Sequence, residues 1–232
     1  MTLRGEPTPM TAETPPLALD IDGTLTDGDG RLDPRTFEYL PEWDAPIVLA
    51  TGKAFPYPVS LCHYLGIDLT VIAENGGVVL ADDTVSYQGD PERAADAVAA
   101  FEGRGGDLGW PAFDAVNEWR ETEIAANVAA DLELLESVAG EFDLEVFDTG
   151  YAYHVKTPGV EKGVGLRAVA DTLGLDPGSF VAVGDSVNDV SMFEVAGRSF
   201  AVANADDDAR TAADTVLEGS YFDGTASVLD SL

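Results

Sequence analysis

Residues 17–26, LALDIDGTLT, carry the pattern around which the rest of this chain is arranged. An apolar run ends there in two carboxylates, Asp20 and Asp22, which a glycine and a hydroxyl follow. This pattern predicts a buried strand that delivers its acids to a turn at its carboxyl end, the edge where open α/β sheets bind ligands. Side chains at i and i+2 share one face of a strand, so both carboxylates can reach one site. Their like charges repel, and the pair therefore needs a cation.

An Asp-Gly turn after a strand is also common in any acidic protein, so a second motif is required. It stands at residues 180–189, FVAVGDSVND, where another apolar strand runs into Asp185 and then into Asn188 and Asp189 at a helix start. Between these motifs, a predicted strand at 47–50 ends in Thr51-Gly52-Lys53. Thr51 and the neighbouring backbone amides could bind a phosphate. The same sequence is also typical of a strand-to-helix turn with no binding role.

Composition narrows the classes of function. The chain has 232 residues, of which 43 are acidic and 12 basic, for a formal net charge of -31. A charge this negative argues against nucleic acid or an anionic membrane as a partner. Hydrophobic residues make up 45% of the chain, which indicates a folded protein. Such an acidic folded chain is typical of a high-salt cytoplasm, where ions screen its self-repulsion.

Cysteine and histidine are too scarce in this chain for a disulfide framework or a zinc cluster. Cys62 is the sole cysteine, and His63 and His154 are the histidines. No apolar run is long enough for a membrane span, and residues 1–16 lack the apolar segment of a signal peptide. We expect a disordered leader at 1–16 and a cytoplasmic protein.

The order of expected elements indicates an α/β fold with a parallel sheet and an inserted α+β unit. Strands and helices alternate along residues 17–81, including a helix at 33–43, and again along 158–232. Between them, residues 82–157 follow the order helix, strand, helix and hairpin, with the strand expected at 118–128. We therefore expect a core domain of 17–81 and 158–232, split by a cap domain of 82–157 that can act as a lid.

The two acidic motifs, together with Thr51 and Lys162 between them, resemble the haloacid dehalogenase superfamily of aspartyl-phosphate hydrolases. The resemblance implies a Rossmann-like core and a small anionic phosphorylated metabolite as substrate. Asp20 is then the nucleophile that forms an aspartyl-phosphate, and Asp22 protonates the leaving oxygen and later activates water. Lys162 stabilises negative charge on the phosphate; its plain alternative is a surface lysine near a helix start.

The same resemblance implies Mg²⁺, which prefers hard oxygen ligands in octahedral geometry. Its expected ligands are Asp20, Asp22 through its backbone carbonyl, Asp185, and Asp189 close by or through water. Thr51 and Gly52, with Lys162, would hold the phosphate.

A cap between the second and third motifs is similar to the type IIB branch. Residues 73–77, 117–121 and 150–154 further resemble archaeal phosphoglycolate phosphatases, which implies hydrolysis of 2-phosphoglycolate to glycolate and phosphate. Thr51-Gly52-Lys53 departs from the serine and asparagine expected around that glycine, which puts substrate identity in question. Arg120 and His154 are the candidate substrate contacts in the cap. Arg120 could equally pair with a neighbouring acid, and His154 could pack at the junction of cap and core.

Two alternatives stay open at this point. A phosphosugar phosphatase or phosphomutase could use the same core, and a screen of phosphorylated metabolites would separate these from a phosphoglycolate phosphatase. The second alternative is not an enzyme but a non-catalytic phosphometabolite-binding protein. The presence of Asp20, Asp22, Lys162 and Asp185 together argues against that class, because binding alone needs no pair of catalytic carboxylates.

Overall fold

The computed structural model describes residues 14–111 and 116–232. Its larger sheet has eight strands in the order β11-β10-β9-β1-β2-β3-β4-β5. Strands β11 to β3 of this order pair in parallel, and β3, β4 and β5 pair antiparallel. The strands are β1 (Leu17–Asp20), β2 (Ile47–Ala50), β3 (Val71–Ala73), β4 (Val78–Ala81), β5 (Thr84–Tyr87), β9 (Val181–Gly184), β10 (Arg198–Ala201) and β11 (Thr215–Val216).

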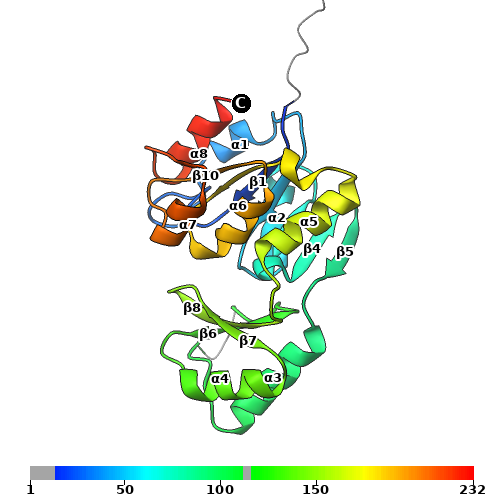
Figure 1. The fold of residues 1–232 in the computed structure, drawn as a ribbon, viewed down its shortest axis with the longest axis vertical. Helices are drawn as coiled ribbons and strands as arrows, with labels where there is room; N and C mark the ends of the chain where they lie inside the picture. The colour runs from blue at the N-terminus through cyan, green and yellow to red at the C-terminus, as the bar shows by residue number, and fades with distance from the viewer. Residues whose placement is uncertain (1–13, 112–115) are drawn as a thin grey trace, which may run out of the picture.

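Helices cover both faces of this sheet (Figure 1). One face packs its buried side chains against α1 (Thr36–Tyr39), α2 (Pro56–Leu65) and α8 (Tyr221–Leu229). The other face packs against α5 (Lys162–Leu173), α6 (Val190–Val195) and α7 (Asp207–Ala212). Strand β1 alternates between them: Leu17 and Leu19 point to the first cluster and Ala18 to the second. The mixed α/β fold expected from the sequence is therefore confirmed, and Asp20 lies on the face of α5.

A smaller antiparallel sheet has the order β6-β8-β7, with β6 (Glu123–Asn127), β7 (Glu145–Asp148) and β8 (Ala152–Lys156). Helices α3 (Pro91–Gly103) and α4 (Leu132–Glu141) pack on it through Phe101, Leu135 and Val138. In Figure 1 this sheet lies between the two helices and the larger sheet. Strand β5 pairs in the larger sheet, so we propose that the inserted domain begins after Tyr87 and not at residue 82.

Three short 3-10 helices stand at turns around the site. They are η1 (Glu74–Gly76), η2 (Pro177–Ser179) and η3 (Val187–Asp189). Glu74 and Asn75 in η1 both have φ of 51°, a left-handed conformation that residues other than glycine seldom adopt. This turn brings β4 back beside β3, as the Asn-Gly pair predicts.

Two expected elements are shorter than the sequence pattern indicated. The helix expected at 33–43 is limited to α1, because the Asp33 side chain accepts from the Arg35 backbone N–H in a turn and Pro41 follows the last helical residues. The strand expected at 118–128 is limited to β6, because the Arg120 backbone N–H donates to the Asn117 carbonyl in a turn.

Residues 1–13 of the expected leader lie outside the described residues. Within the described parts of the chain, none of the helices is long and apolar enough to cross a membrane.

Candidate active site

The carboxyl ends of β1, β2 and β9 meet at one edge of the larger sheet. The register pairs Asp20 of β1 with Ala50 of β2, and Leu19 with Val183 of β9. The residues that follow, Thr51 and Asp185, are therefore brought beside Asp20 by strand pairing alone. This is the edge that the sequence predicted for the site.

Lys162 reaches this edge from the first turn of α5. Its side chain is fully buried, and Nζ donates to Asp20 Oδ1 at 2.7 Å and to Asp189 Oδ1 at 2.6 Å. Burial alone would lower the pKa of Lys162, but Asp189 and Asp20 outweigh it and raise that pKa. The ammonium therefore remains charged between two carboxylates.

Asp189 acts within this group as an internal brace. Its Oδ2 accepts from the backbone N–H groups of Asp185 at 2.9 Å and Ser186 at 3.1 Å, while Oδ1 accepts from Lys162. These contacts fix the turn between β9 and η3, and with it the direction of the Asp185 side chain.

Asp20, Asp185 and Asp189 form a cluster in which one carboxylate oxygen from each lies within 4.8 Å of the others. Burial raises the pKa of Asp20 well above its ordinary value, against the lowering effect of Lys162. Burial and the charge of Asp189 raise the pKa of Asp185 to about 7. Lys162 alone leaves this cluster short of positive charge, which is what a divalent cation would supply.

The backbone approaches the cluster closely at Gly23. Its φ is +83°, and a Cβ there would lie 2.0 Å from Asp185 Oδ2, so both the conformation and the space require glycine. Asn204 holds this contact from the loop after β10. Its Nδ2 donates to the Gly23 carbonyl at 3.0 Å and lies 3.4 Å from Asp185 Oδ2.

One carboxylate oxygen of Asp20 is buried without a protein partner among the described residues. Asp20 Oδ1 accepts from Lys162, whereas Asp20 Oδ2 is buried and has no hydrogen-bond partner among the described residues. Asp20 also lines a cavity of about 490 Å³. A buried unpartnered carboxylate oxygen is costly, so its retention beside a cavity suits either attack on a ligand or a bond to a metal.

Both parts of the molecule line this cavity. The larger sheet's edge contributes Asp20, Asp22, Lys53 and Asp185. The smaller unit, which is the antiparallel sheet β6-β8-β7 with its helices and loops, contributes Arg120, Thr149, Tyr151 and His154. The Asp22 side chain is half exposed and pairs through Oδ1 with Nζ of Lys53. The site therefore sits at the junction of the two units, with a carboxylate and an ammonium facing solvent.

Arg120 lines the cavity, but its guanidinium has three protein acceptors. Nε donates to the Val116 carbonyl at 3.0 Å, one terminal nitrogen pairs with Glu123, and the other donates to the Gly52 carbonyl at 2.8 Å. The side chain is 4% exposed and that of Glu123 is 1% exposed. The pairing with a neighbouring acid that the sequence left open is thus present, and it ties the smaller unit to the end of β2.

Glu123 also forms hydrogen bonds with His154, the other candidate cap residue, and with the core residue Asn75. His154 Nδ1 lies 3.0 Å from Glu123 Oε1, and Asn75 Nδ2 donates to Glu123 Oε2 at 3.0 Å. Burial alone would raise the pKa of Glu123, but the charges of His154 and Arg120 lower it to about 2. His154 therefore lies at the junction and also borders the cavity.

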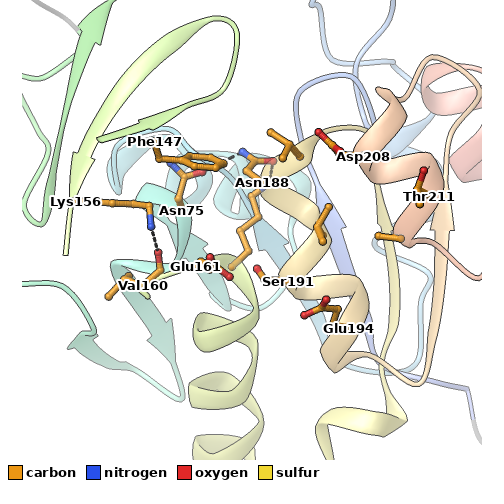
Figure 2. A pocket seen from close by; sticks show the side chains of 14 residues that line it. Asn75, Phe147, Lys156, Val160, Glu161, Asn188, Ser191, Glu194, Asp208 and Thr211 are labelled. Atoms are coloured by element: carbon orange, nitrogen blue, oxygen red, sulfur yellow. Dashed lines mark hydrogen bonds between the residues drawn. The ribbon is translucent and has the colours of Figure 1, made fainter. Parts of the chain in front are cut away.

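A chain of hydrogen bonds runs from this junction to the nucleophile candidate. Asn188 Nδ2 donates to Asn75 Oδ1 at 3.0 Å, and Lys162 Nζ lies 3.2 Å from Asn188 Oδ1. Both asparagines line a second cavity of about 600 Å³, together with Lys156 and Phe147. Figure 2 shows the side chains of Asn75 and Asn188 pointing toward one another. The pair of asparagines thus joins Glu123 to Lys162, and Asn188 lines both cavities.

The structure brings most of the predicted site residues together. Gly52 lines the cavity, whereas Thr51 lies behind it with Oγ1 accepting from the Lys53 backbone N–H at 3.0 Å. Glu74, Asn204 and the bridging role of Asn188 were not predicted from the sequence. Each stands shortly after a predicted strand, which was the available signal, but their partners are distant in sequence.

The chain matches a known protein family. The sequence pattern of the haloacid dehalogenase-like hydrolase family matches residues 17–105 and 122–229. A phosphoglycolate phosphatase of Halorubrum lacusprofundi is 63% identical over 220 residues, which cover 94% of this chain and 97% of the relative. A phosphoglycolate phosphatase of Natronomonas pharaonis is 54% identical over 217 residues, covering 93% and 96%.

Solved structures are similar in fold. A Thermoplasma acidophilum protein superposes with a TM-score of 0.79 at 24% identity, covering 94% of this chain and 97% of that one. A Thermotoga maritima protein superposes with a TM-score of 0.75 at 20% identity, with the same shares covered. The two-unit arrangement is therefore shared along nearly the full length of these chains.

Proposed function

This chain belongs to the haloacid dehalogenase-like hydrolases, and we propose that it is the phosphatase that hydrolyses 2-phosphoglycolate to glycolate and phosphate. The substrate is inferred from phosphoglycolate phosphatases that are 49 to 63% identical over nearly the whole chain. The observation that carries the chemistry is Oδ2 of Asp20, which is buried beside a cavity without a partner in the described ranges 14–111 and 116–232, while Lys162 holds the other oxygen.

Asp20 is the proposed nucleophile. One of its carboxylate oxygens forms a bond to phosphorus as the bond between phosphorus and the glycolate oxygen breaks. Asp22, half exposed in the cavity, gives its proton to that leaving oxygen. Water then loses a proton to Asp22 and attacks the phosphorus, which releases phosphate and restores Asp20. Lys162 neutralises negative charge on Asp20 and the phosphoryl group throughout.

The residues fit Mg²⁺, the ion that phosphatases of this family generally use. The cluster offers oxygen ligands only, one oxygen of Asp20 is free, and burial with mutual repulsion raises the pKa of Asp20 and Asp185. We propose Asp20, the Asp22 backbone carbonyl and Asp185 as ligands, with Asp189 bracing Asp185. When bound, the ion would offset charge on the phosphoryl group and orient it for attack.

Substrate-panel kinetics with Mg²⁺ at molar KCl test this proposal. The panel contains 2-phosphoglycolate, hexose phosphates, glycerol phosphate and an aryl phosphate. We expect the highest kcat/KM for 2-phosphoglycolate. A higher kcat/KM for a hexose phosphate would favour the phosphosugar alternative, and tight binding of every substrate without phosphate release would favour a binding protein.

A further inference from the structure

Lys53 lines the cavity of about 490 Å³ beside Asp20, and its cationic side chain has no role so far. Its side chain is 44% exposed, it borders the cavity beside Asp22, and the Asp22 carboxylate is the ion-pair partner found for it among the described residues. We propose that Lys53 is the specificity-determining residue that binds the carboxylate of the substrate. This inference rests on the proposed function, because it concerns the substrate named there.

Substrate geometry places the carboxylate near Asp22. In 2-phosphoglycolate the carboxylate carbon is joined through one methylene group to the oxygen that leaves phosphorus. Asp22 must lie within hydrogen-bonding distance of that leaving oxygen to protonate it. The carboxylate therefore comes within a few ångströms of Asp22, which is where the ammonium of Lys53 already lies.

The other cations near the site are already engaged. The Arg120 guanidinium has acceptors at Val116, Glu123 and Gly52, and a substrate carboxylate would have to break one of these buried contacts. Lys162 is fully buried and already paired with Asp20 and Asp189. Lys53 alone among these three is both charged and accessible.

The charge of the whole chain strengthens the need for this residue. Where salt does not screen it, a formal net charge of -31 repels a substrate that carries a phosphate and a carboxylate. An exposed ammonium beside Asp22 opposes that repulsion at the point where the carboxylate must lie. It also exchanges its partner at little cost, because a half-exposed ion pair contributes little stability.

The test compares 2-phosphoglycolate with ethyl phosphate, in which a methyl group replaces the carboxylate. For Lys53→Met we expect the ratio of the two kcat/KM values to fall roughly 10- to 150-fold, the usual effect of losing a charge-assisted contact. Most of the loss on 2-phosphoglycolate should appear in KM. Lys53→Arg, which keeps the charge, should retain most of the preference.

Two control variants make the result specific. Arg198→Met removes an exposed cation at the amino end of β10, on the opposite edge of the sheet, and should leave the ratio unchanged. Arg120→Ala should reduce kcat/KM for both substrates by similar factors, because it loosens the junction. A ratio that survives in Lys53→Met, or that falls in Arg120→Ala instead, would overturn the role of Lys53.

Failure of the proposed function gives a different result. A wild-type protein that hydrolyses 2-phosphoglycolate no better than ethyl phosphate has no preference for a carboxylate, and both the substrate and the role of Lys53 are then rejected. A clear preference in the wild type that persists in Lys53→Met rejects the role of Lys53 alone.

Discussion

The carboxylate of Glu74 in the larger sheet's unit accepts two hydrogen bonds from Thr122 of the smaller unit. The backbone N–H of Thr122 donates to Oε2 at 2.7 Å and its hydroxyl donates to the same atom at 2.8 Å. Thr122 is buried against Gly77 and Gly89: a Cβ at Gly77 would lie 1.9 Å from Thr122 Oγ1, and one at Gly89 would lie 2.7 Å from Thr122 Cβ. Thr122 lies between Arg120 and Glu123 in the chain, so these contacts position both residues beside the active site.

We therefore expect Gly77→Ala to weaken the junction. Gly77 has helical φ and ψ, so the added methyl group strains the contact with Thr122 and not the backbone. Overpacking of this kind costs about 1 to 3 kcal/mol. Thermal melts should show a lower Tm than in the wild type. The matched control is Gly140→Ala, inside α4 with open space around the new methyl group, which should be neutral or stabilising. Equal Tm changes in the two variants would contradict this account.

Glu123 gives the junction a defined pH dependence. Burial would raise its pKa, but His154 and Arg120 hold it at about 2, below its ordinary value of 4.5. A lowered pKa contributes stability above pH 4.5, and that stability is lost as the pH falls from 4.5 towards 2. The wild type should therefore exceed Glu123→Gln in free energy of unfolding by up to about 3 kcal/mol at pH 7.

Chemical denaturation of both proteins at fixed KCl, from pH 8 to pH 3, measures this difference. It should shrink as the pH falls below 4.5. A difference that does not change with pH, or that grows on acidification, would show that the Glu123 charge is not what stabilises the junction.

Net charge leads to a separate expectation about salt. A formal charge of -31 on 232 residues repels itself strongly, and the Debye length shortens from about 10 Å at 0.1 M salt to about 3 Å at 1 M. The Tm should therefore rise with KCl from low to molar concentration, and kcat/KM should rise with it. A Tm that stays flat over that range would show that self-repulsion does not limit stability.

Strand ends predicted the core of the site because parallel pairing leaves little freedom. Once β1, β2 and β9 are adjacent, Asp20, Thr51 and Asp185 must meet, and the glycine-rich start of α5 carries Lys162 to them. These placements follow from apolar runs and the residues that end them. Residues 215–216, which form β11, carried no such signal because a strand this short has no periodicity.

The junction was less predictable from sequence. Glu74 and Thr122 are separated by 48 residues, and their contact depends on how the smaller unit packs on the larger one. Arg120 had several acids nearby, and sequence alone does not say that Glu123 would be the buried one. The left-handed backbone at Glu74 likewise depends on contacts made by distant residues.

Asp20 as the attacking group is the central claim, and a rapid acid quench tests it most directly. Wild-type protein with Mg²⁺ at molar KCl is mixed with 2-phosphoglycolate that carries a radioactive phosphate, quenched within one turnover and digested. We predict label on the peptide that contains Asp20, forming and decaying at rates that account for turnover, and none in Asp20→Asn, which should be folded but inactive. Wild-type turnover in pure Asp20→Asn, or label on another peptide, would contradict the account.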